Sequence, residues 1–453
     1  MKVNPFIFRS YDIRGVADAD LTDEVCYAIG RAYGTLLRRE NLKKITLGRD
    51  VRLSSPRIHD ALLKGLLDAG LHVIDVGMVP TPLLYFSIFH LDTDGGIQIT
   101  GSHNPAEYNG FKICKGKETM HGEEIQELRK IIEQEKFVKG KGKVEERDIV
   151  EDYITEIKRR IRVKRAQKVV IDPGNGTCGP IAKRLFEEFG CEVECMNCEP
   201  DGNFPAHLPD PTVVEFIKDL QKRVVDGGFD FGIGYDGDGD RIGVIDDKGN
   251  IIWGDRLLAL YSRKVLKENP GAPVIFEVKC SEALVEYIQK LGGKPVMWKT
   301  GHSWIKAKMK ELKAPLAGEM SGHMFFADNY YGFDDAIFAS MRLLEIVSQE
   351  GKPLSELVSE IPYYHSTPEI RIDSSDEKKF EIVERLKKLY KEKGFDTIDI
   401  DGVRIKFPSG WGLVRASNTQ PVLVLRFEGK TEEDLKKIRE EVEGNLKKIM
   451  QEI

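Results

Sequence analysis

Short apolar strands alternate with amphipathic helices along most of the chain. Apolar runs typical of strands end in glycine and acidic residues at 43–50, 167–176 and 229–241. Between such runs, 123–136 and 212–225 carry apolar residues at helical spacing. Strands that alternate with helices predict α/β domains with mixed, mostly parallel sheets and right-handed crossovers. In such domains, functional residues lie in loops at the carboxyl ends of strands.

The hydrophobic pattern changes after about residue 365. A short strand, a Lys/Glu-rich helix over 376–393, strands through 428 and a final charged helix predict a smaller α+β domain. Earlier boundaries are indicated by the charged, weakly apolar stretch at 139–148 and by a turn signal at 246–250.

Length and charge narrow the class of protein. At 453 residues, the chain has room for roughly three or four domains. Its 68 Lys and Arg residues and 74 Asp and Glu residues nearly balance, which argues against a general nucleic-acid-binding surface. We find neither a secretory signal pattern nor an apolar run of about 18 residues. We therefore expect a cytoplasmic protein that does not span a membrane.

The cysteines offer a second possible chemistry. Seven cysteines, an odd number in a long chain, predict reduced thiols in place of a disulfide framework. Cys191, Cys195 and Cys198 have a spacing found in iron–sulfur sites. The surrounding GCEVECMNCEP has the alternation of a strand, which would place Cys198 on the opposite face from the other two. We therefore predict no cluster here.

A loop with the sequence DGDGDR indicates a metal site. Asp236, Asp238 and Asp240 alternate with glycines, which let the backbone aim three carboxylates at one point. Three hard oxygen ligands suit Mg²⁺ or Mn²⁺. A calcium EF-hand fails because its sixth position is Arg241 and its twelfth is Asp247; a solvated acidic turn is the remaining alternative. With a phosphate oxygen as a further ligand and Arg241 beside it, the loop predicts phosphoryl transfer.

A serine lies in a second polar turn, within IQITGSHNPAEYNGFK at 97–112. The hydroxyl of Ser102 would need an adjacent base to act as a nucleophile, and the side chain of His103 need not point towards it. The G-x-S-x-G elbow of α/β-hydrolases is absent from the sequence. A phosphorylated Ser102 would carry roughly −1.5 to −2 charge and serve as metal ligand and phosphoryl donor. Lys112 would then be its electrostatic partner or a general base, although Ser102 alone could also be a simple turn residue.

Two further loops carry the residue types that bind sugar phosphates. RASNTQP at 415–421 gathers one guanidinium, two hydroxyls and an amide, which suit a phosphate, although a capped turn is the plain alternative. GEMSGH at 318–323 combines a carboxylate, a hydroxyl and a histidine, which suit sugar hydroxyls and proton transfer. His302, in KTGHSWIK at 299–306, is a second proton carrier, and either histidine could instead be structural.

These motifs occur in an order that resembles the α-D-phosphohexomutase superfamily, most closely its phosphomannomutase/phosphoglucomutase branch. They span essentially the whole chain: YDIRG at 11–15, GRDVR at 48–52, TGSHNP at 100–105, DPGNGT at 172–177, DGDGDR at 236–241, TGHS at 300–303, GEMSGH at 318–323 and RASNTQP at 415–421. The resemblance implies three related α/β domains and a smaller C-terminal α+β domain around a central cleft. The corresponding ranges are 1–148, with the phosphoserine loop, 149–250, with the metal loop, 251–365, with the sugar loop, and 366–453, with the phosphate-binding loop.

The resemblance also implies a role for each candidate residue. Ser102 would be the phosphoserine, and its phosphate would join Asp236, Asp238 and Asp240 in binding Mg²⁺. The transferring phosphoryl group would be surrounded by Arg14, Lys112 and Arg241, with Lys112 also the base. The sugar would meet His302, which also transfers protons, together with Glu319, Ser321 and His323. The phosphate that is not reacting would be held by Arg415, Ser417, Asn418 and Thr419.

The implied activity is that of an isomerase of carbohydrate metabolism. It interconverts hexose 1-phosphate and hexose 6-phosphate, with mannose or glucose as the sugar, through a hexose 1,6-bisphosphate intermediate. Glucose 1,6-bisphosphate or mannose 1,6-bisphosphate would be the activator, and no obligate protein partner is expected. A phosphoglucosamine mutase is the first alternative, although Met320 within GEMSGH favours the mannose/glucose branch. A metal-dependent phosphatase or kinase and a non-catalytic sugar-phosphate-binding protein are further alternatives.

Overall fold

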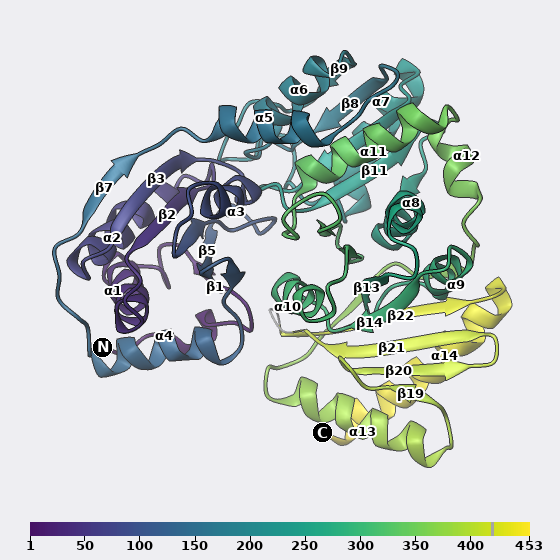
Figure 1. Ribbon diagram of the computed structural model, residues 1–453. Helices are drawn as coiled ribbons and strands as arrows, with labels where there is room; N and C mark the ends of the chain where they lie inside the picture. The colour runs from purple at the N-terminus through teal and green to yellow at the C-terminus, as the bar shows by residue number, and fades with distance from the viewer. Residues whose placement is uncertain (418–420) are drawn as a thin grey trace. The chain divides into compact units, whose positions relative to one another are not determined.

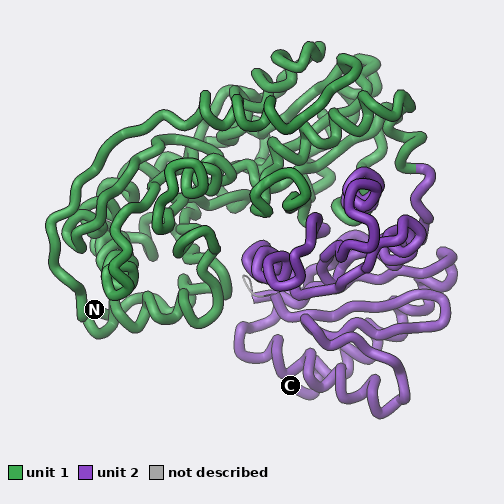
Figure 2. Tube along the Cα trace, in the orientation of Figure 1, with its two compact units in different colours: residues 1–257, 321–358 green, residues 258–320, 359–453 purple. Residues whose placement is uncertain are grey.

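The computed structural model describes residues 1–417 and 421–453, and these form two compact units (Figures 1 and 2). Unit 1 comprises Met1–Leu257 and Ser321–Val358, and unit 2 comprises Leu258–Met320 and Ser359–Ile453. Two residues predicted to bind phosphate, Asn418 and Thr419, lie outside the described residues. None of the helices in the described ranges combines the length and apolar character that a membrane span requires.

The first sheet of unit 1 carries the serine loop. Its strand order is β1-β5-β4-β2-β3-β7, and β6 pairs with β5. Strand β2 runs parallel to β3 and β4, whereas β5 is antiparallel to β4 and β1. The strands are β1 Ile13–Val16, β2 Lys44–Arg49, β3 His72–Met78, β4 Gly95–Ile99, β5 Tyr108–Lys115, β6 Glu118–Thr119 and β7 Lys143–Glu146. The helices of this part are η1 Pro5–Ile7, α1 Asp23–Arg39, α2 Ser55–Asp68, α3 Thr81–His90 and α4 Glu123–Gln134.

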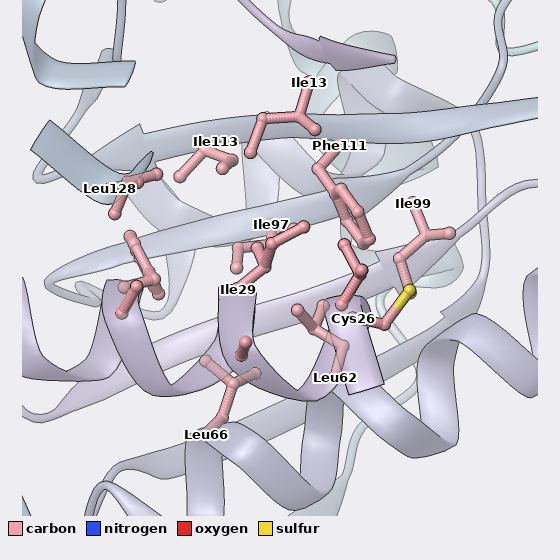
Figure 3. Packing of buried hydrophobic residues seen from close by; sticks show 14 of the residues in the cluster. Ile13, Cys26, Ile29, Leu62, Leu66, Ile97, Ile99, Phe111, Ile113 and Leu128 are labelled. Carbon is pink, nitrogen blue, oxygen red and sulfur yellow. The ribbon is translucent and has the colours of Figure 1, made fainter. Parts of the chain in front are cut away.

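A hydrophobic core holds the helices against this sheet (Figure 3). Ile97 of β4 and Ile113 of β5 are buried together with Ile29 of α1 and Leu62 of α2. Burying an aliphatic side chain of this size contributes about 1.5–3 kcal/mol. Helices α1 and α2 pack closely because Gly30 has no side chain: a Cβ atom there would lie 2.4 Å from the carbonyl oxygen of Leu62. The core therefore fixes the sheet whose β4 end presents the serine.

The second sheet of unit 1 carries the acidic loop. Its order is β12-β11-β10-β8-β9, with β10 parallel to β8 and antiparallel to β11. The strands are β8 Lys168–Asp172, β9 Glu192–Cys195, β10 Phe231–Tyr235, β11 Ile242–Asp246 and β12 Ile251–Ile252. The helices are α5 Val150–Arg160, α6 Gly179–Glu188 and α7 Val214–Gly227, and the later segments of unit 1 add β16 Met324–Phe326, α11 Ala336–Glu350 and α12 Leu354–Ser359.

Unit 2 contains a parallel sheet and an antiparallel sheet. In the parallel one, β13 lies between β14 and β15. The antiparallel sheet has the order β17-β22-β21-β20-β19, with β18 also paired to β22. The strands are β13 Pro273–Glu277, β14 Lys294–Trp298, β15 Leu316–Gly318, β17 His365–Ser366, β18 Ile370–Asp373, β19 Thr397–Ile398, β20 Val403–Phe407, β21 Gly410–Ala416 and β22 Val422–Gly429. The helices are α8 Gly254–Glu268, α9 Glu282–Lys290, α10 His302–Leu312, α13 Lys378–Glu392 and α14 Glu432–Glu452.

The predicted fold class is confirmed, and the predicted helices 123–136, 212–225 and 376–393 correspond to α4, α7 and α13. The prediction of reduced thiols is wrong at two positions, because Cys195 and Cys198 form a disulfide with Cα atoms 5.6 Å apart. Strand β9 ends at Cys195, and Asn197 has a φ of 48°, so the chain turns back on itself where a continuous strand was expected. The other cysteines, Cys26, Cys114, Cys178, Cys191 and Cys280, are buried and lie outside the disulfide.

Candidate active site

Ser102 is presented by a strained turn after β4. Its φ is 50°, in the left-handed region where a residue with a Cβ atom pays roughly 1–2 kcal/mol. Its backbone nitrogen donates to the hydroxyl oxygen of Thr100 at 2.8 Å. The buried guanidinium of Arg52 donates to the carbonyl oxygens of Ser102 at 2.8 Å and of Asn104 at 2.6 Å. These bonds over-determine the turn, which is how a folded protein keeps a strained residue in place.

The three predicted metal-binding aspartates meet in the turn between β10 and β11. Asp236, Asp238 and Asp240 are fully buried, and one carboxylate oxygen of each lies within 4.8 Å of the others. Asp236 also orders the turn itself, because its Oδ1 accepts hydrogen bonds from the backbone nitrogens of Gly239 at 3.0 Å and Asp240 at 3.1 Å. The sequence DGDGDR therefore folds into a convergent acidic group, as its spacing predicted.

The serine turn and the acidic turn touch each other. The hydroxyl of Ser102 donates to Oδ2 of Asp236 at 2.9 Å. Gly237 makes this approach possible, since a Cβ atom there would lie 2.6 Å from the carbonyl oxygen of Ser102. The hydroxyl oxygen also lies 3.1 Å from Nδ1 of His103, a contact that the sequence left open. Burial and the positive charges of Arg241 and Arg14 lower the pKa of His103 well below its usual value.

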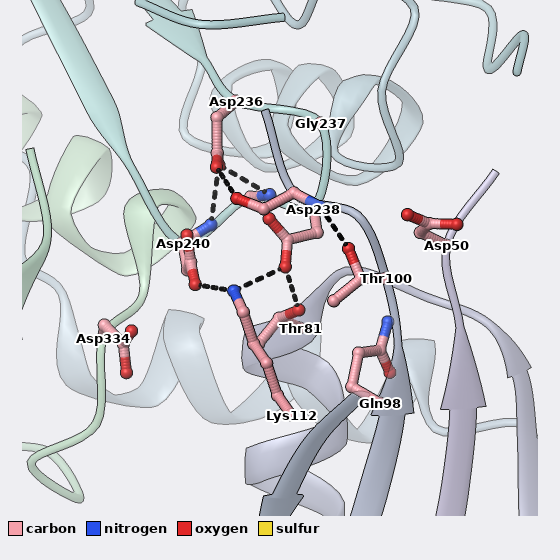
Figure 4. Close-up of polar contacts among 12 residues, drawn as sticks. Asp50, Thr81, Gln98, Thr100, Lys112, Asp236, Gly237, Asp238, Asp240 and Asp334 are labelled. Carbon is pink, nitrogen blue, oxygen red and sulfur yellow. Dashed lines mark hydrogen bonds and ion pairs between the residues drawn. The ribbon is translucent and has the colours of Figure 1, made fainter. Parts of the chain in front are cut away.

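Lys112 on β5 inserts its ammonium group between two of the aspartates (Figure 4). Its Nζ lies 2.7 Å from Oδ2 of Asp238 and also contacts Asp240. Burial lowers the pKa of Lys112, but the charges of Asp238 and Asp240 outweigh it and raise that pKa above its usual value. Burial and the charges of Asp240 and Asp238 raise the pKa of Asp236. The arrangement thus places a positive charge where the carboxylates repel each other.

The acidic group fits a divalent metal ion. Oδ1 of Asp238 is buried and has no hydrogen-bond partner among the residues that the structure describes. Its other oxygen accepts from Lys112 and from the hydroxyl of Thr81 (Figure 4). Carboxylate oxygens alone form the group, which is the ligand chemistry of hard cations.

Arg14 contacts the serine turn, and Arg241 contacts the acidic turn. Arg14 on β1 donates to Oδ1 of Asn104 in the serine turn at 2.8 Å and pairs with Asp12 at 2.7 Å. Arg241 follows the acidic turn directly, and its Nε lies 4.0 Å from Oδ2 of Asp236. Arg14 thus contacts the loop that carries Ser102, and Arg241 lies beside the aspartate that accepts from the Ser102 hydroxyl.

Ser321 and His323, predicted to meet the sugar, lie beside the acidic group. Nδ1 of His323 is 2.8 Å from the hydroxyl oxygen of Ser321, and its Nε2 is 3.3 Å from Oδ1 of Asp240. Asp334 is also buried, and its Oδ2 lies 3.9 Å from Nε2 of His323. Asp334, His323 and Asp240 together form a second group able to hold a metal ion. We did not predict a role for Asp334, since its surroundings GFDD resemble an ordinary polar loop.

The remaining predicted residues lie in unit 2. His302 is buried as the first residue of α10, and Oε1 of Glu319 accepts from the backbone nitrogen of Gly301 at 2.6 Å. Arg415 on β21 pairs through Nε with Oδ2 of Asp401 at 3.0 Å, and Ser417 donates its backbone N–H to the carbonyl oxygen of Val422 at 3.0 Å. Unit 1 thus contains the serine, the acidic group and its cations, whereas unit 2 contains this second set.

Sequence reasoning also missed residues that hold the site in shape. Arg52 lies in the motif GRDVR, but only its four carbonyl partners around the serine turn reveal its purpose. Thr81 lies between Pro80 and Pro82 at the start of α3, and nothing local indicates that its hydroxyl donates to Asp238. Both contacts join segments distant in the sequence, so a local pattern could not predict them.

Comparison with known families finds a matching domain model for each of four successive stretches of the chain. Models of the phosphoglucomutase/phosphomannomutase alpha/beta/alpha domains I, II and III match residues 5–139, 151–249 and 253–364, and that of the C-terminal domain matches 369–444. The chain belongs to the phosphoglucomutase/phosphomannomutase family. The predicted resemblance is confirmed.

Similar relatives cover nearly the whole chain. A phosphomannomutase/phosphoglucomutase of Pseudomonas aeruginosa is 49% identical over 98% of this chain and 96% of its own length. A phosphoglucomutase of Neisseria gonorrhoeae is 45% identical over 96% of this chain and 95% of its own length. Among solved structures, a phosphoglucomutase/phosphomannomutase family protein from Burkholderia thailandensis superposes with a TM-score of 0.94 at 42% identity, covering 99% of this chain and 98% of that one.

Proposed function

We propose that the protein is a hexose phosphate mutase that interconverts the 1-phosphates and 6-phosphates of mannose and glucose. The observation that carries this proposal is the hydroxyl of Ser102, 2.9 Å from Asp236 in a buried acidic group. A phosphorylated serine at this position can donate its phosphoryl group to a sugar and recover it from the other end. The name phosphomannomutase/phosphoglucomutase of a 49% identical relative supports the same reaction.

The transfer begins with phosphorylated Ser102. The free hydroxyl oxygen of the hexose monophosphate loses its proton and bonds to phosphorus, the bond from phosphorus to Oγ of Ser102 breaks as Oγ takes up a proton, and a hexose 1,6-bisphosphate and the free serine hydroxyl result. Asp236, Asp238 and Asp240, with the serine phosphate, would hold Mg²⁺, which supplies Lewis-acid stabilisation of charge on the transferring group. Arg14, Arg241 and Lys112 add positive charge around the same group, as their positions beside the two turns allow.

Proton transfer needs a group other than Lys112 in the arrangement observed. Its ammonium group pairs with Asp238 and Asp240, so we propose that Lys112 acts as an electrostatic partner, and service as a base would require loss of these aspartate contacts. We assign the proton of the attacking sugar hydroxyl to His302 or His323. General acid–base help of this kind is worth about 10²–10⁴-fold in rate.

The second half of the reaction returns the phosphoryl group. The bisphosphate turns end for end, and its other phosphate passes to Ser102, which leaves the isomerised monophosphate. We propose that Glu319 and Ser321 bind the sugar hydroxyls in both orientations. We assign the phosphate that is not reacting to Arg415, Ser417, Asn418 and Thr419. Glucose 1,6-bisphosphate or mannose 1,6-bisphosphate would restore a dephosphorylated Ser102 and so act as activator.

The domain boundaries, the location in the cell and the partners of the protein are also part of the proposal. We propose four domains at 1–148, 149–250, 251–365 and 366–453, a cytoplasmic location, and hexose phosphates as the substrates, without an obligate protein partner. A phosphoglucosamine mutase is the alternative, because the same serine and acidic group would serve a hexosamine phosphate equally well.

The test is isomerisation of mannose 1-phosphate and glucose 1-phosphate, measured side by side with Mg²⁺ and a trace of glucose 1,6-bisphosphate. We expect turnover of both. Glucosamine 1-phosphate forms a third arm, and turnover of that sugar alone would replace the proposal by the hexosamine alternative. Release of inorganic phosphate without isomerisation would instead indicate a phosphatase.

A further inference from the structure

The turn at Thr300 and Gly301 donates consecutive backbone N–H groups to two different carboxylates. The nitrogen of Thr300 donates to Oδ2 of Asp401 at 3.0 Å, and that of Gly301 donates to Oε1 of Glu319 at 2.6 Å. The hydroxyl of Thr300 donates in turn to Oε2 of the fully buried Glu277 at 3.1 Å. One turn of unit 2 therefore fixes Asp401 and the predicted sugar ligand Glu319 together.

Asp401 holds a second predicted ligand with the same oxygen. Its Oδ2 accepts from Nε of Arg415 at 3.0 Å, and only 12% of the Asp401 side chain and 5% of the Arg415 side chain are exposed. The next residue, Gly402, allows this approach: its φ is 81°, and a Cβ atom there would lie 2.5 Å from Cβ of Arg415. The loop between β19 and β20 is thus shaped to bring the carboxylate against the guanidinium.

We infer that Asp401 is a positioning residue that ties the guanidinium of Arg415 to the Thr300–Gly301 turn. This inference rests on the proposed function, in which Arg415 binds the remote phosphate and Glu319 binds sugar hydroxyls. Asp401 and the two consecutive N–H groups form one chain of hydrogen bonds. This chain positions both Arg415, the phosphate ligand, and Glu319, the sugar ligand. The bond at Nε fixes the plane of the guanidinium, and a guanidinium recognises phosphate oxygens through that planar geometry.

The expected effect is on substrate binding. The remote phosphate is held in the ground state and the transition state alike, so loosening its ligand raises KM more than it lowers kcat. Asp401→Asn keeps the size of the side chain but removes the charge from a charge-assisted hydrogen bond. We expect KM for glucose 1-phosphate to rise about tenfold, with kcat within about threefold of the wild type.

Asp399→Asn is the matched control. Asp399 lies two residues earlier in the chain, and its carboxylate contacts Lys391 and Lys387 of α13. We expect both kinetic constants of this variant to equal those of the wild type. Gly402→Ala provides a second, independent test, because the added Cβ would push the Asp401 loop away from Arg415 and leave the carboxylate intact. It should raise KM in the same way as Asp401→Asn.

A double-mutant cycle separates positioning from a general effect on the fold. If Asp401 acts through Arg415, Asp401→Asn should change kcat/KM less than about twofold in an Arg415→Ala background. Additive losses, or an unchanged KM in both Asp401→Asn and Gly402→Ala, would overturn the inference. Failure of the wild-type protein to turn over any hexose phosphate would refute the proposed function itself, and that result is obtained before the variants are compared.

Discussion

Ser102 combines a strained backbone with a hydroxyl that donates to Asp236 and contacts His103. Arg52 holds the strained turn in place by donating to its carbonyl oxygens. Because the backbone is held in this way, the Ser102 hydroxyl itself contributes little to the fold. A net hydrogen bond is worth about 0.5–1.5 kcal/mol. We therefore expect the Ser102 hydroxyl to contribute to catalysis far more than to stability.

Ser102→Ala should abolish isomerisation and leave the protein folded. We expect turnover of glucose 1-phosphate at the assay background and a loss of about 1 kcal/mol in the free energy of unfolding. Coupled-assay kinetics measure the turnover, and thermal melting measures the change in stability. Wild-type turnover in Ser102→Ala would exclude a phosphoserine at this position, and activity reduced only in step with unfolding would mark Ser102 as structural.

His207 illustrates how one side chain makes stability depend on pH. Its Nδ1 lies 2.9 Å from the carbonyl oxygen of Leu208 and its Nε2 lies 3.0 Å from Oδ2 of Asp172. Since both partners are acceptors, both contacts are hydrogen bonds only when the ring carries two protons. Burial lowers the pKa of His207, but the hydrogen bonds with Asp172 and Leu208 outweigh it and raise the pKa above its usual value.

The raised pKa predicts a stabilisation that is lost at high pH. It is fully present below the unfolded-state pKa of about 6.5 and disappears as pH rises through the folded-state value. The free energy of unfolding of the wild type should exceed that of His207→Gln by more at about pH 6 than at about pH 9. Urea denaturation at the two pH values measures this difference. Equal differences at both would show that His207 stabilises the fold by packing alone.

At the scale of elements, the site depends on how closely two turns approach. Strands β4 and β10 belong to different sheets, and each presents a functional turn beyond its carboxyl end. Their backbones come within reach of each other at Gly237 and Ser102, where no side chain fits. Gly237 is therefore required for the contact between the serine turn and the acidic turn, in addition to its use within the acidic turn.

Gly237→Ala should separate the serine turn from the acidic turn. The new Cβ would lie 2.6 Å from the carbonyl oxygen of Ser102, so one backbone must move. Because misplacement of reacting groups by about 1 Å can cost about 10²-fold, we expect kcat to fall by about that factor.

Gly444→Ala is the control: Gly444 lies in α14, with nothing within 4 Å of an added Cβ. That change should leave kcat unaltered and stabilise the protein by about 0.4–1 kcal/mol. Equal kcat values in the two variants would contradict the packing argument.

At the scale of the whole molecule, folding buries Asp236, Asp238 and Asp240 together. Burial and the charges of the other two aspartates raise the pKa of Asp236, and Arg241 and Lys112 offset only part of this rise. Binding of a divalent cation at this group should therefore stabilise the folded protein independently of catalysis.

Mg²⁺ should raise the melting temperature, and a chelator should reverse the rise. A ligand at a hundred times its dissociation constant stabilises the folded state by about 2.7 kcal/mol. Asp238→Asn should abolish most of the shift. Asp247→Asn should keep it, because Asp247 instead accepts hydrogen bonds from the backbone nitrogen of Ser355 at 2.7 Å and from its hydroxyl at 2.9 Å. The same shift in all three proteins would place the ion elsewhere.

The sequence by itself determined the alternation of strands and helices, the convergence of the aspartates in DGDGDR and the family of the chain. These features are local: apolar spacing and glycine-bounded turns depend on neighbours in the chain. The ends of individual elements were less certain, as at Cys195, where the strand stopped and the chain turned to form a disulfide.

Only the tertiary structure decided which distant groups meet. Arg52 on the serine turn, Thr81 on Asp238, Asp334 beside His323 and Asp401 on Arg415 each join segments that no local pattern connects. Such contacts arise because packed sheets bring loop ends together and because buried polar groups must find partners wherever the fold leaves them. Residue types and spacing thus set the chemistry of this protein, and long-range packing set its geometry.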